Sequence, residues 1–482
     1  MHPLKICLYI VVALLALLGL TFASGTYKLG DGNVQDGFSV YNSVIKYPTI
    51  ETFFKDASVS KDQKNAFKGI VENIGSVVKD EKAEIPDFTK IDSTKIERFH
   101  YPGAAGEFIQ KLRAQLQAPN CRIIHYGDSQ LEGDRISAYL RNRLQALYGG
   151  SGPGFIPIKQ EYHQVSAVVT PSENWLRYAS FDPSKPLFAN KNYGAYLSVS
   201  RFTPVYDAVV DSVAIPELVP VKATINISPS SKQYAKLKTY SSIGLHYGNA
   251  TAPVSIKVYN DGALLKEEML VSDGKYHCYK INVATTPVNL QIEMEATTSP
   301  DFYGLTLDGS EGILLDNVAM RGSSGTVFAN LNSESFGGMY QQLQPKILIF
   351  QFGGNTVPYL KDSLAVKNYT GYLKSQLNWV RRKAPDASVI FVGPSDMATT
   401  INGEIKSYAL LPYLDAQLKE SCLSNNIAYW SMFKAMGGEN SMPYWVDQKL
   451  AGSDYTHFTG PGTQIISELF FTALHLDLTN KK

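Results

Sequence analysis

Cysteine is scarce in this sequence, and the few cysteines present follow no motif. The 482 residues contain four of them, far apart and without a CxxC pair: Cys7, Cys121, Cys278 and Cys422. This number and spacing argue against a disulfide framework and against a zinc site. No cluster of His, Cys and Glu points to another metal. We therefore expect neither a metal ion nor any other cofactor.

An excess of charge of either sign is also missing. Lys and Arg number 45 and Asp and Glu number 44, a net charge of +1, which gives no support for nucleic-acid binding. The stretch 149–154 reads GGSGPG but has neither the Lys-Ser/Thr ending of a P-loop nor a GxGxxG pattern, so we expect a tight loop there. With 44% hydrophobic and 18% charged residues, the chain is typical of globular proteins, and its length predicts two or three units.

One long apolar run is present, at the amino terminus. His2 and Lys5 precede an almost wholly apolar stretch from Ile6 to Ala23. We assign residues 1–25 either to a secretory signal cleaved near Ala23 or to an uncleaved anchor that attaches the protein to a membrane. Under both interpretations the body of the protein is exported, to the periplasm or the cell surface.

Residues 26–100 are polar and mixed, and we expect an extension there without chemistry of its own. Its one helical candidate, at about 61–78, places Phe67, Ile70 and Ile74 on one stripe.

From residue 165 to residue 312 the pattern has the period of β-strands. Apolar and polar residues alternate along Ala223–Ile227, Val254–Val258 and Leu290–Met294, as they do in half-buried strands. Asn260-Asp261-Gly262 is a hairpin turn signal between two such runs. The pattern predicts an inserted all-β domain, an antiparallel sandwich.

On both sides of this insert, at 101–164 and 313–482, helix-like and strand-like segments alternate. Ile347–Phe352 is a continuous apolar run of the kind that forms a central strand of a parallel sheet. The sequence thus predicts an α/β domain that is split around the insert. Further strands are expected at Val389–Val392 and Ile427–Trp430, and helices at Phe108–Leu116, after Ser129 up to Gly149, at Tyr369–Val380, at Leu411–Leu423 and from Pro461 onwards.

The stretch Ile123–Tyr126 stops abruptly at Gly127-Asp128-Ser129, and a helix-like segment follows. Open α/β sheets carry their sites at the carboxyl ends of the strands, so Ser129 is a candidate nucleophile. The alternative is an ordinary strand-to-helix turn in which Asp128 or Ser129 caps the helix.

A serine nucleophile needs a base, and the base needs an orienting acid. In Asp454-Tyr-Thr-His457 a carboxylate precedes a histidine by three residues, in a loop before the final helix. At that spacing Asp454 can hold the Nδ1 of His457 and leave Nε2 for the serine. A DxxH motif is also common in surface loops. His125, in the strand before Ser129, is better explained as a core residue.

An acyl-transfer site also needs donors for the developing oxyanion. The backbone N–H of Ser129 is one candidate. Gly325, in the turn Gly322-Ser323-Ser324-Gly325, can present a second N–H, and the side-chain amide of Asn355 at the end of a buried strand a third. Each of these features is common by itself.

In this order the four segments resemble the blocks of the SGNH (GDSL-type) hydrolases: Gly127-Asp128-Ser129, Gly325, Gly354-Asn355 and Asp454-x-x-His457. The resemblance covers about residues 123–131 and 316–482. It implies a flavodoxin-like three-layer fold, a triad of Ser129, Asp454 and His457, and an oxyanion hole of Ser129, Gly325 and Asn355. Gln130 and Thr356 depart from residues common in the family.

The long β insert resembles, in architecture alone, that of secreted polysaccharide or peptidoglycan O-acetylesterases. The expected function is an exported serine esterase that removes small acyl groups, O-acetyl above all, from a cell-envelope or extracellular glycan through an acyl-enzyme on Ser129. Three alternatives stay open: a glycan O-acetyltransferase with the same triad, a lipase-like or thioester hydrolase, and a glycan-binding protein without activity.

Overall fold

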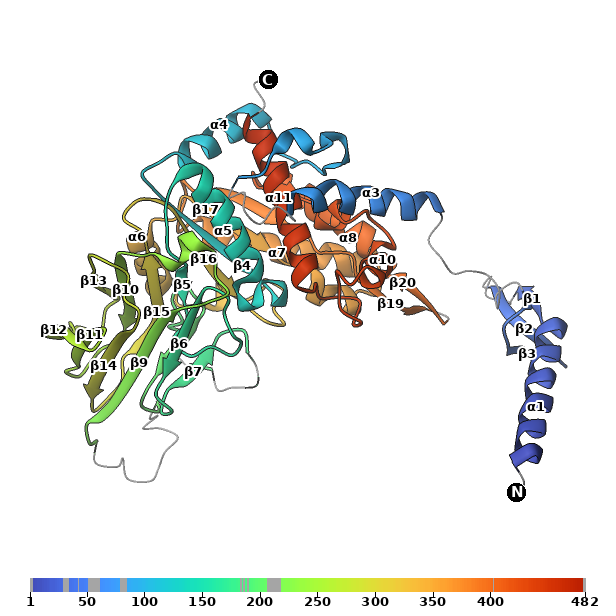
Figure 1. The fold of residues 1–482 in the computed structure, drawn as a ribbon, viewed down its shortest axis with the longest axis horizontal. Helices are drawn as coiled ribbons and strands as arrows, with labels where there is room; N and C mark the ends of the chain where they lie inside the picture. Colours follow the sequence, from blue (N-terminus) through green and yellow to red (C-terminus); the bar gives the residue numbers. More distant parts are fainter. Residues whose placement is uncertain are drawn as a thin grey trace. The chain divides into compact units, whose positions relative to one another are not determined.

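The computed structural model describes residues 3–28, 34–41, 43–50, 61–78, 85–182, 184, 187–188, 190–205, 218–401 and 403–479. The chain divides into two compact units, residues 1–64 with 401–405 and residues 65–400 with 406–482. Among its described residues the smaller unit contains helix α1 (Pro3–Ala23) and a three-stranded antiparallel sheet (Figure 1) of β1 (Gly25–Lys28), β2 (Val34–Val40) and β3 (Ser43–Lys46).

Helix α1 is the apolar run at the amino terminus. Its segment Leu4–Ala23 has a mean hydropathy of 2.7 and is almost entirely unburied, and it is long and apolar enough to cross a membrane. A signal sequence has the same length and composition. Within this unit the Tyr47 hydroxyl donates a hydrogen bond to the Leu17 carbonyl at 2.8 Å, which joins the sheet region to the helix.

The larger unit is organised around a five-stranded parallel sheet in the order β16-β4-β17-β18-β21. In chain order β4 is the first of these strands and β16 the second, so the order is 2-1-3-4-5, that of flavodoxin-like folds. The predicted fold class is therefore confirmed. The strands are β4 (Asn120–Gly127), β16 (Gly312–Ala319), β17 (Ile347–Gln351), β18 (Ser388–Val392) and β21 (Ala428–Trp430).

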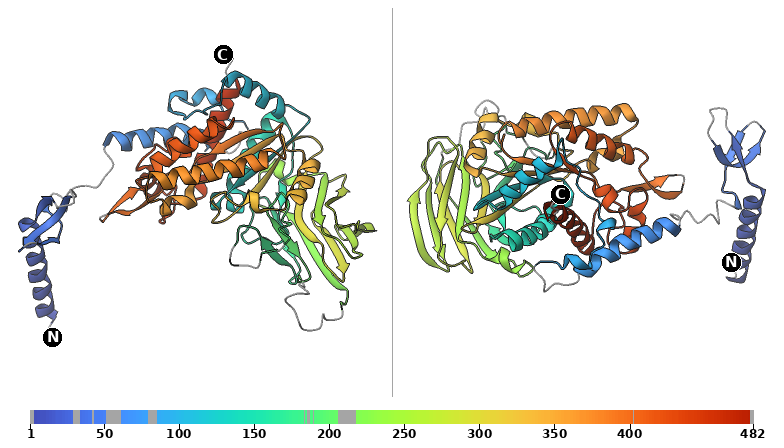
Figure 2. Two further views of the ribbon diagram at one scale, coloured as in Figure 1. Left: turned by 180° about the vertical axis from the view of Figure 1, so that it is seen from behind. Right: turned by 90° about the horizontal axis from the view of Figure 1, so that it is seen from above.

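Helices cover both faces of this sheet (Figures 1 and 2). Two of them pack against each other on one face, α5 (Arg135–Tyr148) and α11 (Gly460–Thr479). The other face carries α6 (Ser333–Leu343), α7 (Ser363–Arg381) and α8 (Leu411–Leu423), whose apolar stripes share one core with the sheet. The helices expected at Tyr369–Val380 and from Pro461 onwards are present as α7 and α11, and Leu373, Leu377, Ile466 and Leu469 on them are buried.

The insert is a sandwich of two antiparallel sheets (Figure 2). One sheet contains β5 (Gly154–Ile156), β7 (Leu176–Ala179), β8 (Ser198–Arg201), β10 (Ser242–Gly248), β13 (His277–Asn282) and β15 (Asp301–Asp308). The other contains β6 (Ala167–Pro171), β9 (Val221–Pro229), β11 (Ser255–Asn260), β12 (Ala263–Met269) and β14 (Leu290–Ala296). Asp261 and Gly262 form the two-residue turn between β11 and β12, both with positive φ, as a type I′ hairpin requires.

The remaining elements belong neither to the parallel sheet nor to the sandwich. Helix α3 (Lys61–Val78) has the bounds that the sequence predicts, and its Phe67 packs 5.7 Å from the ring of Tyr444. The other elements are α4 (Ala105–Leu116), α9 (Met432–Ala435), α10 (Ser441–Asp447), the hairpin β19 (Ala398–Ile401) and β20 (Glu404–Ser407), and the 3-10 helices η1 (Phe88–Lys90), η2 (Ser93–Lys95), η3 (Ser129–Asp134), η4 (Ala235–Lys238), η5 (Phe328–Asn330) and η6 (Gly354–Tyr359).

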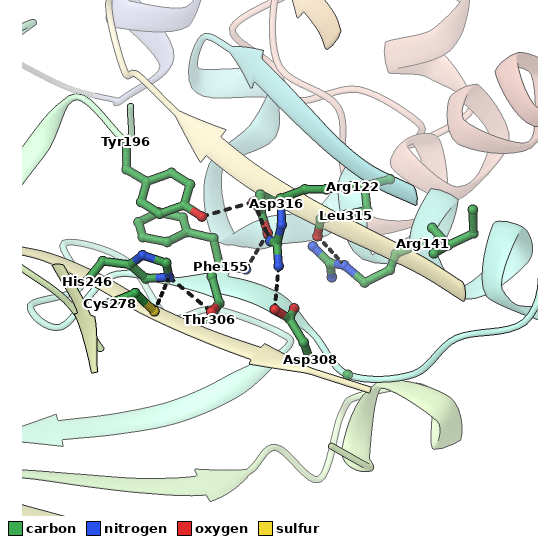
Figure 3. A network of polar contacts seen from close by, with 12 residues as sticks. Arg122, Arg141, Phe155, Tyr196, His246, Cys278, Thr306, Asp308, Leu315 and Asp316 are labelled. Carbon is green, nitrogen blue, oxygen red and sulfur yellow. Dashed lines mark hydrogen bonds and ion pairs between the residues drawn. The ribbon is translucent and has the colours of Figure 1, made fainter. Parts of the chain in front are cut away.

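A buried arginine joins the parallel sheet to the sandwich (Figure 3). Arg122 of β4 donates to both carboxylate oxygens of Asp316 on β16, at 2.7 and 2.8 Å, and also to Asp308 of β15. Asp316 in turn accepts hydrogen bonds at 3.0 Å from the Phe155 N–H of β5 and from the Tyr196 hydroxyl. The Asp316 carboxylate thus links the parallel sheet to the sandwich. Strand β5 lies ahead of residue 165, where the insert is expected to begin, and it nevertheless pairs with β15 in the sandwich.

Candidate active site

The turn after β4 presents Ser129 at the carboxyl edge of the sheet. Asp128 caps the following 3-10 helix, since its Oδ1 accepts a hydrogen bond from the Gln130 N–H at 3.0 Å. Gly127 has no room for a side chain, because a Cβ there would meet the Leu131 side chain at 2.6 Å and the Gln351 carbonyl at 3.1 Å. Asp128 therefore holds this turn, and Ser129 is left free to face the cavity.

The structure brings Ser129, His457 and Asp454 together. The Ser129 Oγ lies 2.8 Å from His457 Nε2, and His457 Nδ1 lies 2.7 Å from Asp454 Oδ2. Asp454 Oδ1 accepts hydrogen bonds at 3.1 Å from the Thr456 and His457 N–H groups. Partial burial raises the pKa of Asp454, but the hydrogen bonds from His457 and Thr456 outweigh it, and the pKa lies below the usual range. An ionised Asp454 therefore fixes the imidazole with Nε2 toward the serine.

A direct bond connects the serine turn to the histidine loop. Gln130 Nε2 donates to the Thr456 carbonyl at 2.8 Å, immediately before His457. The sequence marks Gln130 merely as a departure from the family pattern and predicts no partner for it. In the structure Gln130 holds together two loops that are 326 positions apart in the chain.

Asn355 follows β17, the strand beside β4. All five strands are parallel, but the order in which the chain adds them to the sheet reverses between β4 and β17. Open α/β sheets form their crevice at such a point. The Asn355 side-chain nitrogen donates to the Ser323 carbonyl at 3.2 Å and makes a longer contact of 3.4 Å with Asp128 Oδ2. Ser129 and Asn355 therefore line one cavity, of about 290 Å³, together with His457.

Gly325 lies differently from the sequence expectation. Its N–H donates to the Ser323 Oγ at 3.1 Å, and a Cβ on it would meet the Phe352 ring at 2.8 Å. The glycine of this turn that lines the cavity is Gly322, which has open space around its Cα. In the described part of the chain nothing accepts a hydrogen bond from the Gly322 N–H. The geometry thus favours Gly322 over Gly325 as the glycine that donates into the cavity.

Two buried titratable residues that precede Ser129, Asp128 and His125, have shifted pKa values. Burial raises the pKa of Asp128 to about 6, although the Gln130 N–H and the nearby His457 act in the opposite direction. Burial lowers the pKa of His125 to about 3, so this imidazole is neutral. His125 is a core residue, as the sequence indicates, and bonds the Ser137 hydroxyl at 3.0 Å.

Sequence reasoning missed two residues on the rim of the cavity, Arg321 and Tyr359. Tyr359 is 79% exposed and lies four residues after Asn355 of the Gly354-Asn355 motif. A search for aromatic residues just beyond the family blocks would have found it. Among the described residues no group of three or more His, Cys, Asp or Glu side chains is arranged to hold a metal ion.

Comparison with known proteins gives a likeness of fold. No protein-family model matches the chain, and no curated protein matches its sequence. A solved peptidoglycan O-acetylesterase superposes with a TM-score of 0.59 at 17% identity, over 79% of this chain and 99% of that one. Family 2 carbohydrate esterases from Clostridium thermocellum (11% identity, 61% of this chain and 96% of that one) and Corynascus thermopiles (12%, 55% and 97%) reach TM-scores of 0.25 and 0.27. The chain therefore has an α/β core of the SGNH hydrolase type with an inserted β domain, and it shares its overall fold with the peptidoglycan O-acetylesterase.

Proposed function

We propose that this protein is an exported serine esterase that removes small acyl groups, acetyl above all, from a cell-envelope or extracellular glycan. The observation that carries the proposal is the continuous line of hydrogen bonds from Asp454 through His457 to Ser129. It ends in a cavity lined by Ser129, Gly322 and Asn355, whose N–H groups are the candidate oxyanion donors. Nucleophile, base, orienting acid and oxyanion donors are the parts that acyl transfer requires.

In the first half of the reaction the Ser129 Oγ attacks the ester carbonyl carbon while its proton moves to His457 Nε2. The carbonyl oxygen becomes an oxyanion and accepts hydrogen bonds from the Ser129 N–H and the Asn355 amide, with the Gly322 N–H as third donor in place of Gly325. The C–O bond to the sugar then breaks, and His457 returns the proton to the sugar oxygen. Asp454 stabilises the imidazolium that exists between these steps.

In the second half water attacks the acyl-enzyme while His457 Nε2 takes one of its protons. The bond to the Ser129 Oγ breaks, the carboxylic acid leaves and the proton returns to the serine. Each turnover thus consumes one water and one ester and yields one alcohol and one acid. No step uses a cofactor.

Two observations support the substrate and the location. The peptidoglycan O-acetylesterase with the same fold acts, by its name, on an acetylated glycan, which is an argument by analogy. Helix α1 has the composition of a signal or an anchor, which suits a protein that acts outside the cytoplasm.

The test is hydrolysis of an aryl acetate by the full chain, together with labelling by a fluorophosphonate probe. We expect Ser129→Ala to abolish turnover and labelling while the circular dichroism spectrum stays the same. Ser375→Ala, at an exposed position of α7, is the control and keeps both. Turnover and labelling that survive in Ser129→Ala would exclude the proposed nucleophile. Acetate release from a panel of O-acetylated glycans then identifies the polymer.

A further inference from the structure

A second cavity, of about 190 Å³, lies beside the Ser129 cavity and is referred to below as the seam cavity. The parallel-sheet domain contributes Glu132 of η3 and Arg321 after β16, and the sandwich contributes residues from β5, β7 and β8. Arg321 lines both cavities, and Glu132 lies three residues after Ser129, at the kink of the η3 segment. The seam cavity is thus adjacent to the place where the ester is proposed to react.

The floor of the seam cavity is rigid. The rings of Phe155 and Tyr196 stack with centroids 3.7 Å apart, and both residues are buried. Their orientation is fixed by Asp316, which accepts from the Phe155 N–H and the Tyr196 hydroxyl (Figure 3). The ion pair of Asp316 with Arg122 therefore also holds this floor in place.

The walls combine aromatic faces with paired charges. The Arg321 guanidinium lies 5.0 Å above the ring of Tyr162 and 3.6 Å from Glu132. Across the cavity Arg177 lies 5.7 Å above the ring of Phe181. Three acidic and three basic side chains line the space, so its net charge is zero: Glu132, Glu161, Asp182, Lys159, Arg177 and Arg321. This lining suits an uncharged ligand with many hydroxyl groups better than an ion.

One acceptor in the seam cavity lacks a partner. Glu132 Oε1 is buried and has no hydrogen bond from any described residue. A buried carboxylate oxygen without a donor is costly, and a ligand hydroxyl would satisfy it once the Glu132 carboxylate turns toward the cavity. The volume corresponds to about six waters at liquid density, which is the size of one pyranose ring.

We infer that the seam cavity binds one uncharged sugar residue of the glycan, next to the sugar whose ester reacts at Ser129. This inference rests on the proposed esterase function. Tyr162, which is 43% exposed, offers its ring face to the sugar, and Glu132 accepts from a sugar hydroxyl. The β insert therefore forms one wall of the substrate site, and recognition of the second sugar requires both domains.

The first test measures how the rate depends on substrate length. O-acetylated monosaccharides and the matching disaccharides are compared in the gluco, xylo and N-acetylglucosamine series. We expect kcat/KM to rise at least tenfold from mono- to disaccharide in one series. Tyr162→Ala should reduce that gain to less than threefold, whereas Tyr162→Phe, which keeps the ring, and Tyr372→Ala, an exposed tyrosine of α7, should retain it.

The second test measures binding without turnover. Calorimetric titration of Ser129→Ala with the unacetylated disaccharide should show binding that weakens at least fivefold when Tyr162→Ala is added. If aryl acetate is hydrolysed but no series gains from a second sugar, the subsite is excluded and the esterase stands. If aryl acetate is not hydrolysed, the esterase proposal fails and the titration alone decides the sugar site. Weaker disaccharide binding after Tyr162→Ala supports the site, and equal binding with and without Tyr162→Ala excludes it.

Discussion

The Ser129 Oγ and His457 Nε2 lie 2.8 Å apart, although 328 positions separate them in the chain. Three local features produce this approach: the cap made by Asp128, the bond from Gln130 to the Thr456 carbonyl, and the hydrogen bonds that Asp454 accepts from its own loop. Each of them orients a side chain of the proposed relay before any substrate binds. The predictions below separate their contributions.

Asp454→Asn should lower kcat for an aryl acetate on the order of a thousandfold or more, because an amide favours the wrong imidazole tautomer. The melting temperature should change little, since Asp454 is mostly exposed. Asp447→Asn, an exposed acid of α10, is the control and should keep full activity. Equal activity of both variants would show that the relay stops at His457.

Asn355→Ala should reduce kcat about a hundredfold or more, as expected for the loss of one oxyanion donor, with a smaller effect on KM. The measurement is steady-state hydrolysis of an aryl acetate. Asn425→Ala, outside the cavity, is the comparison. A variant with wild-type kcat would reduce Asn355 to a structural role, namely its bond to the Ser323 carbonyl.

The two glycines of the Gly322–Gly325 turn should respond differently to alanine. Both have positive φ, at 75° and 79°, which costs about 1 kcal/mol for any residue with a Cβ. At Gly325 the new Cβ also collides with the Phe352 ring, so the free energy of unfolding should fall by about 2 kcal/mol or more. Denaturant titration of both variants measures whether Gly325→Ala is less stable than Gly322→Ala. Greater destabilisation by Gly322→Ala would contradict the packing described for this turn.

Arg122→Met should destabilise the larger unit by about 3–5 kcal/mol, because it leaves Asp316 and Asp308 buried without their cation. The variant should also lose any gain from a second sugar, since Asp316 orients the floor of the seam cavity. Arg382→Met, an exposed arginine after α7, should be close to neutral in urea unfolding. Equal losses of unfolding free energy in Arg122→Met and Arg382→Met would argue against a stabilising link by Arg122 between the parallel sheet and the sandwich.

Stability should fall as the pH rises from about 4 to about 6, in part because of Asp396. Burial raises the pKa of Asp396 to about 6 from the ordinary 3.8, despite hydrogen bonds from Ser407 and the Met442 N–H. In this window the folded protein keeps a proton that the unfolded chain releases, so the free energy of unfolding decreases with pH, on the order of 3 kcal/mol for this group. Asp128 acts in the same direction.

Asp396→Asn removes one of these contributions and should flatten the profile of unfolding free energy between pH 4 and pH 7. Urea titrations at several pH values measure this for wild type and variant. Parallel profiles would mean that Asp396 keeps an ordinary pKa in the folded protein.

Periodicity predicted strands such as β9, β14 and β17 and helices such as α3 and α7, because each depends on which face of a segment is buried. It did not predict α6, β7 or β8. The motifs also predicted which residues meet at the carboxyl edge, since Ser129 and Asn355 each follow a parallel strand. The choice between Gly322 and Gly325 was not predictable, because it depends on the Ser323 hydroxyl taking one N–H. The seam cavity was not predictable either, since it needs β5 and β8 in one sheet beside η3.

The chain enters and leaves the insert at nearly the same point. The Gly149 carbonyl accepts from the Ile313 N–H at 3.0 Å, and the Ser151 carbonyl accepts from the Gly309 N–H at 2.9 Å. When the sandwich folds and β5 pairs with β15, it brings the end of α5 to the start of β16. The parallel pairing of β4 with β16 then closes a short effective loop in place of one that contains the whole insert, which lowers its entropic cost. We therefore expect this connection to favour an order of folding in which the sandwich forms before the parallel pairing of β4 with β16.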